Sequence, residues 1–295
     1  MAVSSNANSS PSVGIIGAGK LGSVLISAFG KRVAWIVCHS QNQAEEIHKQ
    51  FPTTLIYTSL KEITTLSDVI ILTVPDRTIK EVAEELSTQF GTNDSNSVVI
   101  HCSGALGVDE LISCHEVGMR TVAAHPFQTF TGNNIEALQG IAWGIECEPN
   151  DETFVEELVH DLGGIPVILS EITRKNKAVY HASAVVASNF VTMLVEVAKE
   201  FAQVAGINDV FLTPIIHQAV KNSLTAVHMN TPLPLTGPIA RADISTLKLH
   251  RLALENTPLW ELYSILSKAT AIVAFRNSII TFEEFENIKN VVKDE

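Results

Sequence analysis

Lys177 and His181 are the two residues whose types and spacing best suit acid catalysis. They stand at positions i and i+4 in a stretch without Gly or Pro, so a helix would place both on one face. A carbonyl that receives a hydride develops negative charge on its oxygen. An ammonium or imidazolium group can donate to that oxygen and deliver the proton. The alternative is a solvated lysine and a histidine that only packs. We predict a catalytic role for the pair, and the sequence leaves open which residue is the proton donor.

Ser103, His125 and Arg241 are further candidates for holding or protonating a substrate. The hydroxyl of Ser103 could bind a carboxylate or a carbonyl. Pro126 restricts His125 to extended geometry, so its imidazole could project from a strand end and bind substrate or act as an acid. Arg241 could clamp a carboxylate through two parallel hydrogen bonds. The structural alternatives are a plain turn at Ser103, a buried hydrogen-bonded histidine, and an arginine that pairs with Asp243 or fixes a dimer contact.

A glycine-rich turn near the start of the chain has the spacing of a dinucleotide-binding fingerprint. It lies between an expected strand, residues 13–16, and an expected helix, residues 20–29. The first glycine permits the tight turn, the second lets the backbone approach a pyrophosphate, and the third lets the helix pack against the strand. The helix N-terminus then offers free N–H groups to the phosphates. The predicted cofactor-binding residues of this turn are Gly17, Ala18, Gly19, Lys20, Leu21 and Gly22.

The turn after the second expected strand favours NADP over NAD. An acidic residue there usually bonds the ribose hydroxyls of NAD. This strand instead ends in Cys38-His-Ser-Gln41, and the first carboxylate is Glu45. Nothing in the turn would repel a 2′-phosphate, and His39 and Ser40 could hydrogen-bond one. NAD remains the alternative, because the turn also lacks Arg and Lys.

Other cofactor contacts are expected where later strands end. Ligands of open α/β sheets bind outside the carboxyl ends of the strands. The strand at residues 68–74 therefore places Val74 and Pro75 against the cofactor, and the strand at residues 97–102 places Ser103 near the nicotinamide. We interpret Asp76 as the N-cap of the following helix.

Two domains are expected to carry these residues. Up to about residue 170, short apolar runs alternate with helical stretches, as in a doubly wound parallel α/β sheet. Residues 171–205 suit one long helix that Gly206 would stop, and the rest of the chain is also helical. The predicted division is a disordered tail at 1–10, a Rossmann dinucleotide-binding domain at 11–170, and an all-α domain for substrate binding and dimerisation at 171–295.

Composition narrows the function classes. Residues 1–170 hold 8 Lys and Arg against 20 Asp and Glu, whereas residues 171–295 hold 12 of each, so we expect no nucleic-acid or membrane partner. No apolar run approaches the roughly 20 residues of a membrane span. The four cysteines form no metal-ligand pattern, so we expect reduced thiols, no metal site and a cytoplasmic protein.

The order of the motifs resembles one protein family. Besides the glycine turn it includes Thr73-Val-Pro-Asp76, His101-Cys-Ser-Gly104, His125-Pro126, Lys177-Ala-Val-Tyr-His181 and Pro234-Leu-Thr-Gly-Pro-Ile-Ala-Arg241. The chain resembles, over about residues 12–276, the Rossmann-like NADP oxidoreductases with a helical C-terminal domain of unknown function. Wider relatives are the β-hydroxyacid dehydrogenases, ketopantoate reductase and pyrroline-5-carboxylate reductase. The resemblance implies a 6-phosphogluconate-dehydrogenase-like helical domain and a homodimer, and it supplies no substrate.

The resemblance also bears on single residues. Dehydrogenases of the wider group carry a Lys and, four residues later, an Asn on the helix that matches Lys177, and here His181 replaces that Asn. The Ser103-Gly104 turn matches their substrate-contacting segment. We therefore expect an NADP-dependent oxidoreductase that transfers a hydride to or from a small anionic carbonyl, imine or hydroxy acid. The alternatives are a non-catalytic dinucleotide-binding regulator and a prephenate-dehydrogenase-like enzyme, since His-Pro also occurs in the latter.

Overall fold

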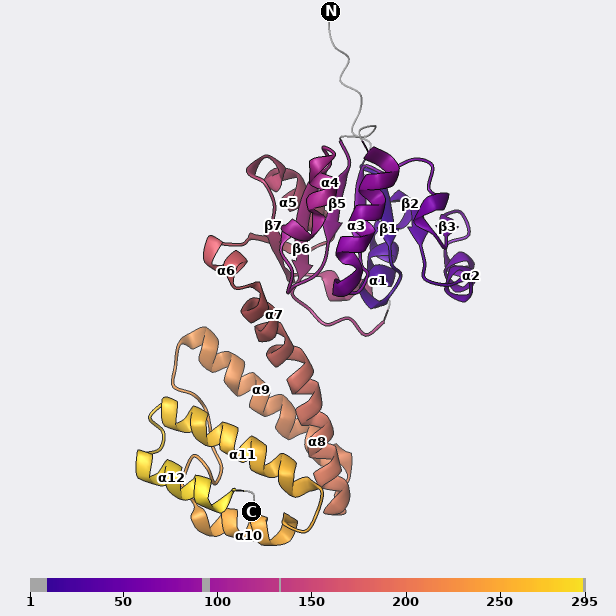
Figure 1. The fold of residues 1–295 in the computed structure, drawn as a ribbon. Coiled ribbons are helices and arrows are strands. Elements are labelled where there is room, and N and C mark those ends of the chain that lie inside the picture. Colours follow the sequence, from indigo (N-terminus) through magenta and orange to yellow (C-terminus); the bar gives the residue numbers. More distant parts are fainter. Residues whose placement is uncertain (1–9, 92–95, 133, 294–295) are drawn as a thin grey trace, which may run out of the picture. The chain divides into compact units, whose positions relative to one another are not determined.

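The chain divides into two compact units, Met1–Ser188 and Asn189–Glu295 (Figure 1). The computed structural model describes residues 10–91, 96–132 and 134–293. The tail expected at residues 1–10 therefore lies outside the described residues except for Ser10. The change of pattern expected after residue 170 coincides with the end of the last described strand. Two further helices, α6 Glu171–Lys175 and α7 Lys177–Val185, still belong to the first unit.

The first unit has the predicted Rossmann-like fold. Among the described residues, eight strands form one sheet in the order β3-β2-β1-β4-β5-β6-β7-β8. Strand order reverses between β1 and β4, and the carboxyl edge at such a switch point is the usual ligand site. The strands are β1 Val13–Ile16, β2 Val33–Val37, β3 Leu55–Tyr57, β4 Val69–Leu72, β5 Val98–His101, β6 Arg120–Pro126, β7 Ala142–Glu146 and β8 Ile165–Ile168.

The predicted parallel sheet has one antiparallel pair of strands near its edge. Strand β7 runs antiparallel to β6, with His125 opposite Gly144 and Ala123 opposite Glu146, and β8 follows β7 in parallel. A parallel neighbour needs a crossover connection, usually a helix. The described part of the segment between β6 and β7 holds only the 3₁₀ turn η5, Ile135–Leu138, so the chain returns directly. This reversal places Glu146 beside the middle of β6.

Helices cover both faces of the sheet, and for this reason the strands are continuously apolar. One face packs against α1 Lys20–Phe29, α2 Gln41–Gln50 and α5 Glu152–Asp161. The other packs against α3 Asp76–Phe90 and α4 Ile112–Glu116. The described residues of this unit also form shorter 3₁₀ turns, among them η1 Gly30–Arg32, η2 Leu60–Glu62, η4 Val108–Leu111 and η6 Pro149–Asp151.

The long helix expected at residues 171–205 is interrupted. Helix α6, Glu171–Lys175, ends at Asn176, whose side-chain amide donates to the Ile172 carbonyl. Helix α7, Lys177–Val185, then continues through a π-helical segment, Val186–Phe190, into α8, Val191–Val204. The prediction that Gly206 stops the helix is confirmed, since its φ is +69°.

By length and composition alone, the helical stretch Lys177–Val204 could span a membrane. The expectation that no apolar stretch is long enough for a membrane span therefore does not hold for this stretch.

The second unit is helical, as predicted. After α8 come η8 Asp209–Phe211, α9 Leu212–Met229, α10 Ile244–Leu254, α11 Leu259–Arg276 and α12 Phe282–Val291. Its core gathers Leu247, Ala271, Ala274 and Ile288 from α10, α11 and α12. Helices α8 and α9 leave many large apolar side chains exposed.

Candidate active site

The glycine turn has the geometry expected of a dinucleotide-binding loop. Gly17 has a φ of +98°, and a Cβ there would lie 2.8 Å from the Thr73 carbonyl oxygen. The Thr73 hydroxyl donates to the Gly17 carbonyl at 2.6 Å, which ties the turn to the end of β4. A Cβ at Gly22 would overlap the Gly17 carbonyl oxygen. Both glycines are therefore required by packing of the turn itself.

Gly19 differs from its neighbours because a Cβ there would meet no described atom within 4 Å. It occupies the N-cap position of α1 without a side-chain cap. Ala18 is buried and Leu21 packs against the core, whereas the Lys20 ammonium reaches across to donate to the Thr131 carbonyl at 2.9 Å. The open space and the free helix N-terminus fit a pyrophosphate, but binding by these residues stays a prediction.

Gln43, in the first turn of α2, contacts the turn after β2 and is not among the predicted site residues. His39 and Ser40 are exposed, and Ser40 accepts a hydrogen bond from the Gln43 backbone N–H as the N-cap of α2. The Gln43 side chain accepts from the His39 backbone N–H at 3.3 Å and donates to the Ala18 carbonyl at 2.9 Å. The Ser-x-x-Gln spacing of a capping box could have revealed it.

The ends of β4 and β5 are joined by Ser103. Its hydroxyl donates to the Asp76 carboxylate at 2.8 Å and accepts from the backbone N–H groups of Ala105 and Leu106 at 3.2 Å each. Pro75, not Asp76, is the N-cap of α3, so the predicted capping role of Asp76 is wrong. The Asp76 carboxylate accepts a hydrogen bond from the Ser103 hydroxyl, which follows the neighbouring strand, and does not cap its own helix α3. Pro75 is exposed and Val74 half-buried at the same edge.

His101 is a structural residue of this turn. It is fully buried; its Nδ1 accepts from the Ser103 backbone N–H at 3.2 Å, and its Nε2 bonds the Gly107 carbonyl at 2.8 Å. Because the carbonyl can only accept, the proton lies on Nε2. Burial lowers the pKa of His101 to about 4. The imidazole is therefore neutral and fixed in one tautomer.

Two other histidines meet at the backbone of Gly104. A Cβ on Gly104 would lie 2.8 Å from Nε2 of His125 and 2.8 Å from Cδ2 of His181. His125 Nδ1 is 3.0 Å from the Tyr180 hydroxyl, and its ring packs edge-on against Tyr180, His181 and Phe127. Burial, followed by the nearby His181, lowers the pKa of His125 to about 4. The structure thus brings together the predicted residues His125 and His181.

Tyr180 was missed in the sequence analysis, although it lies between the two predicted residues of its helix. Its hydroxyl approaches β7 so closely that a Cβ on Gly144 would lie 2.5 Å away. Burial raises the pKa of Tyr180 to about 12, so the phenol keeps its proton. The i, i+3 spacing from Lys177 places Tyr180 on the same helix face and could have indicated it.

Lys177 is not the solvated charge considered as an alternative. Its side chain is 4% exposed, and its Nζ lies 3.2 Å from the Glu146 carboxylate on β7. Burial lowers the pKa of Lys177 while Glu146 opposes that shift. Lys177 and His181 share one helix face, as predicted, but the Lys177 ammonium already has Glu146 as a partner.

Arg241 belongs to the second unit, where it follows Gly237 and precedes α10. The Asp243 carboxylate is the N-cap of α10 and accepts from Ser245 and Thr246. These hydrogen bonds, more than the charge of Arg241, lower the pKa of Asp243 to about 2. A substrate contact by Arg241 stays a prediction.

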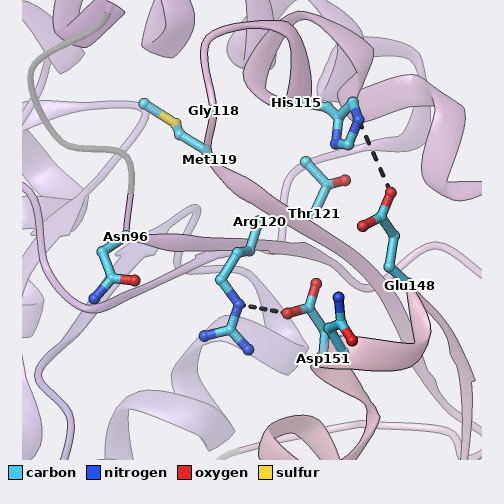
Figure 2. A pocket seen from close by; sticks show the side chains of 9 residues that line it. Asn96, His115, Gly118, Met119, Arg120, Thr121, Glu148 and Asp151 are labelled. Carbon is cyan, nitrogen blue, oxygen red and sulfur yellow. Dashed lines mark hydrogen bonds and ion pairs between the residues drawn. The ribbon is translucent and has the colours of Figure 1, made fainter.

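A polar hollow of about 520 Å³ lies at the opposite, amino-terminal edge of the sheet (Figure 2). Arg120, the first residue of β6, pairs there with Asp151, and His115 lies 4.0 Å from Glu148. Figure 2 shows both pairs along the wall of the hollow. The hollow contains no residue predicted to bind a cofactor, and ligands of open α/β sheets bind at the other edge.

Two family models match the chain in succession. Residues 3–126 match a Rossmann-like domain, and residues 141–270 match a domain of unknown function, DUF2520. The chain therefore contains a Rossmann-like domain followed by a DUF2520 domain. The predicted resemblance is thereby confirmed. A comparison with curated proteins finds no match.

Solved structures share this fold. A "putative NADP oxidoreductase" from Bacteroides fragilis aligns over 88% of this chain and 98% of its own, with 19% identity and a TM-score of 0.71. An imine reductase from Myxococcus stipitatus in complex with NADP+ aligns over 96% and 100%, with 16% identity and a TM-score of 0.65. Pyrroline carboxylate reductase from Plasmodium falciparum with NADP bound aligns over 96% and 98%, with 15% identity and a TM-score of 0.54. At these identities the likeness establishes the fold.

Proposed function

We propose that this Rossmann-DUF2520 protein is an NADP-dependent oxidoreductase that reduces a carbonyl or imine group of a small acid. The observation that carries the proposal is the glycine turn, which is closed at Gly17 and Gly22 but open at Gly19 above the N-terminus of α1. The bound nucleotides named for the imine reductase and the pyrroline carboxylate reductase support the same cofactor. A bound NADPH would supply the hydride.

The proton would come from the histidines at Gly104. As a hydride adds to the carbon of the substrate, its oxygen or nitrogen gains negative charge and needs a donor. His125, near the carboxyl end of β6, and His181, in α7, both lie next to Gly104. We assign the donor role to His181, because Nδ1 of His125 is engaged by Tyr180 and the Lys177 ammonium by Glu146. Tyr180 holds the His125 ring in place.

Titration with NADPH and NADH, followed by nicotinamide fluorescence, tests the cofactor assignment. Gly19→Ala should fold normally, because its φ of −72° suits alanine and its Cβ meets nothing, yet it should weaken NADPH binding about tenfold or more by entering the space of the pyrophosphate. Gly22→Ala is the matched comparison and should lower thermal stability, because its Cβ overlaps the Gly17 carbonyl. Wild-type protein that binds neither nucleotide would contradict the proposal.

A screen of keto acids and cyclic imines with NADPH then tests turnover. We expect His181→Ala to keep NADPH affinity and to lose most of kcat. If the protein binds NADPH but turns over no compound, with or without His181, the non-catalytic regulator becomes the better description.

We also propose that the protein acts as a homodimer formed through its helical unit. The exposed apolar side chains of α8 and α9 support this assembly, because monomers rarely leave large apolar patches in water.

A further inference from the structure

One side chain joins the two segments between which an adenosine ribose would lie. In Rossmann domains that ribose sits between the glycine turn and the carboxyl end of β2. Here the Gln43 amide oxygen accepts from the His39 N–H after β2, and its amide nitrogen donates to the Ala18 carbonyl of the glycine turn. Both ends of the amide are used, so its orientation is fixed.

The turn after β2 and the first turn of α2, residues 38–44, contain no carboxylate. Glu45 lies on a different side of α2, where with Ala44 and His48 it lines a hollow against Thr54, Leu55 and Ile56. Gln43 therefore places a neutral group next to the expected ribose site, at a position where a carboxylate of equal size would fit.

Resting on the proposed dinucleotide binding, we propose that Gln43 sets the preference of this protein for NADP over NAD. Its amide holds the His39–Ser40 turn against the glycine turn without adding negative charge, so a 2′-phosphate with about two negative charges can approach. A carboxylate in its place would repel that phosphate by Coulomb interaction and would bond the free 2′-hydroxyl of NAD. The residue thus determines specificity through both its shape and its lack of charge.

The test compares dissociation constants for NADPH and NADH in three variants of the full chain. Gln43→Glu should raise the ratio Kd(NADPH)/Kd(NADH) about tenfold or more over wild type, because only NADPH carries the repelled phosphate. Gln43→Lys should lower the ratio, because a cation attracts it. Gln50→Glu, at the other end of α2, makes the same chemical change about 10 Å further along the helix and should leave the ratio within about twofold.

The ratio distinguishes specificity from a structural role. Loss of the bond to Ala18 weakens binding of both nucleotides equally, so a purely structural Gln43 would leave the ratio unchanged in both Gln43 variants. That result, with both nucleotides still bound, overturns the inference and leaves the proposed function intact. Wild-type protein that prefers NADH overturns the inference as well, and one that binds neither nucleotide overturns both proposals. If Gln43→Glu does not fold, a lowered ratio in Gln43→Lys supports the inference and an unchanged ratio contradicts it.

Discussion

The buried residue His101 makes the stability of this fold depend on pH. His101 has an ordinary pKa of 6.5 in the unfolded chain and about 4 in the folded protein, because burial disfavours its charged form. Between these pH values the unfolded state binds more protons than the folded state. The contribution of His101 to the free energy of unfolding is therefore fully present above pH 6.5 and is lost as the pH drops toward 4. A shift of this size corresponds to about 2 kcal/mol lost between pH 7 and pH 5.

Urea unfolding at pH 7 and pH 5 measures this loss. We expect His101→Gln to be less stable than wild type at pH 7, because two backbone contacts depend on the imidazole, but to lose less stability on acidification. His48→Gln, an exposed position on α2, is the control and should follow wild type at both values. An identical loss in His101→Gln and wild type would show that His101 does not titrate on unfolding.

At the residue scale, the sequence predicted those parts of the site that depend on local spacing. The packing roles of Gly17 and Gly22 could be predicted because they follow from one turn, whereas the role of Gly19 toward a pyrophosphate stays a prediction. The partner of Lys177 could not, because Glu146 lies 31 residues away and reaches it only through the register of β7. The Ser103 bond to Asp76 likewise depends on two strands being neighbours.

At the scale of elements, apolar runs predicted the strands but not their direction. A run such as residues 141–147 reads the same in a parallel or antiparallel strand, so the reversal of β7 was missed. The break at Asn176 was missed because the stretch lacks Gly and Pro, whereas an asparagine that bonds its own helix can end it equally well. The end of α8 before Gly206 was predictable because glycine adopts that left-handed backbone conformation more readily than other residues.

The buried ion pair between Lys177 and Glu146 joins α7 to β7 and leads to a stability prediction. Removing one partner of a buried pair leaves the other charge without compensation, which costs about 3–5 kcal/mol. We expect Glu146→Gln to lower the free energy of unfolding by about this amount, and the double variant with Lys177→Met to recover much of it. Glu171→Gln breaks the exposed pair with Lys175 and is the matched control, with an expected change below about 1 kcal/mol.

Denaturant unfolding of the four proteins provides the measurement. A loss in Glu146→Gln as small as in Glu171→Gln would mean that the lysine is already neutral in the folded protein. This outcome would also return Lys177 to consideration as a proton donor, because its ammonium would not be committed to the carboxylate.

At the scale of the whole molecule, α9 indicates how two chains would meet. Val220, Leu224 and Val227 follow the i, i+4, i+7 spacing of an apolar helical stripe and are 44%, 55% and 75% exposed. Ala226 is buried, about two residue steps of 100° round the helix from Leu224, so the stripe faces away from the core of its own unit. A second copy of the same stripe would cover it, as expected for a two-fold homodimer.

Light scattering of the purified chain tests this assembly. We expect wild type to have twice the 32.0 kDa chain mass at micromolar concentration, and Leu224→Glu to shift toward the single mass, because each interface would bury two unpaired carboxylates. Thr225→Glu adds the same group about 100° round the helix and should remain dimeric. Wild type at the single mass would contradict the homodimer. A Leu224→Glu variant that stays dimeric while wild type is dimeric would place the interface on another face of the helical unit.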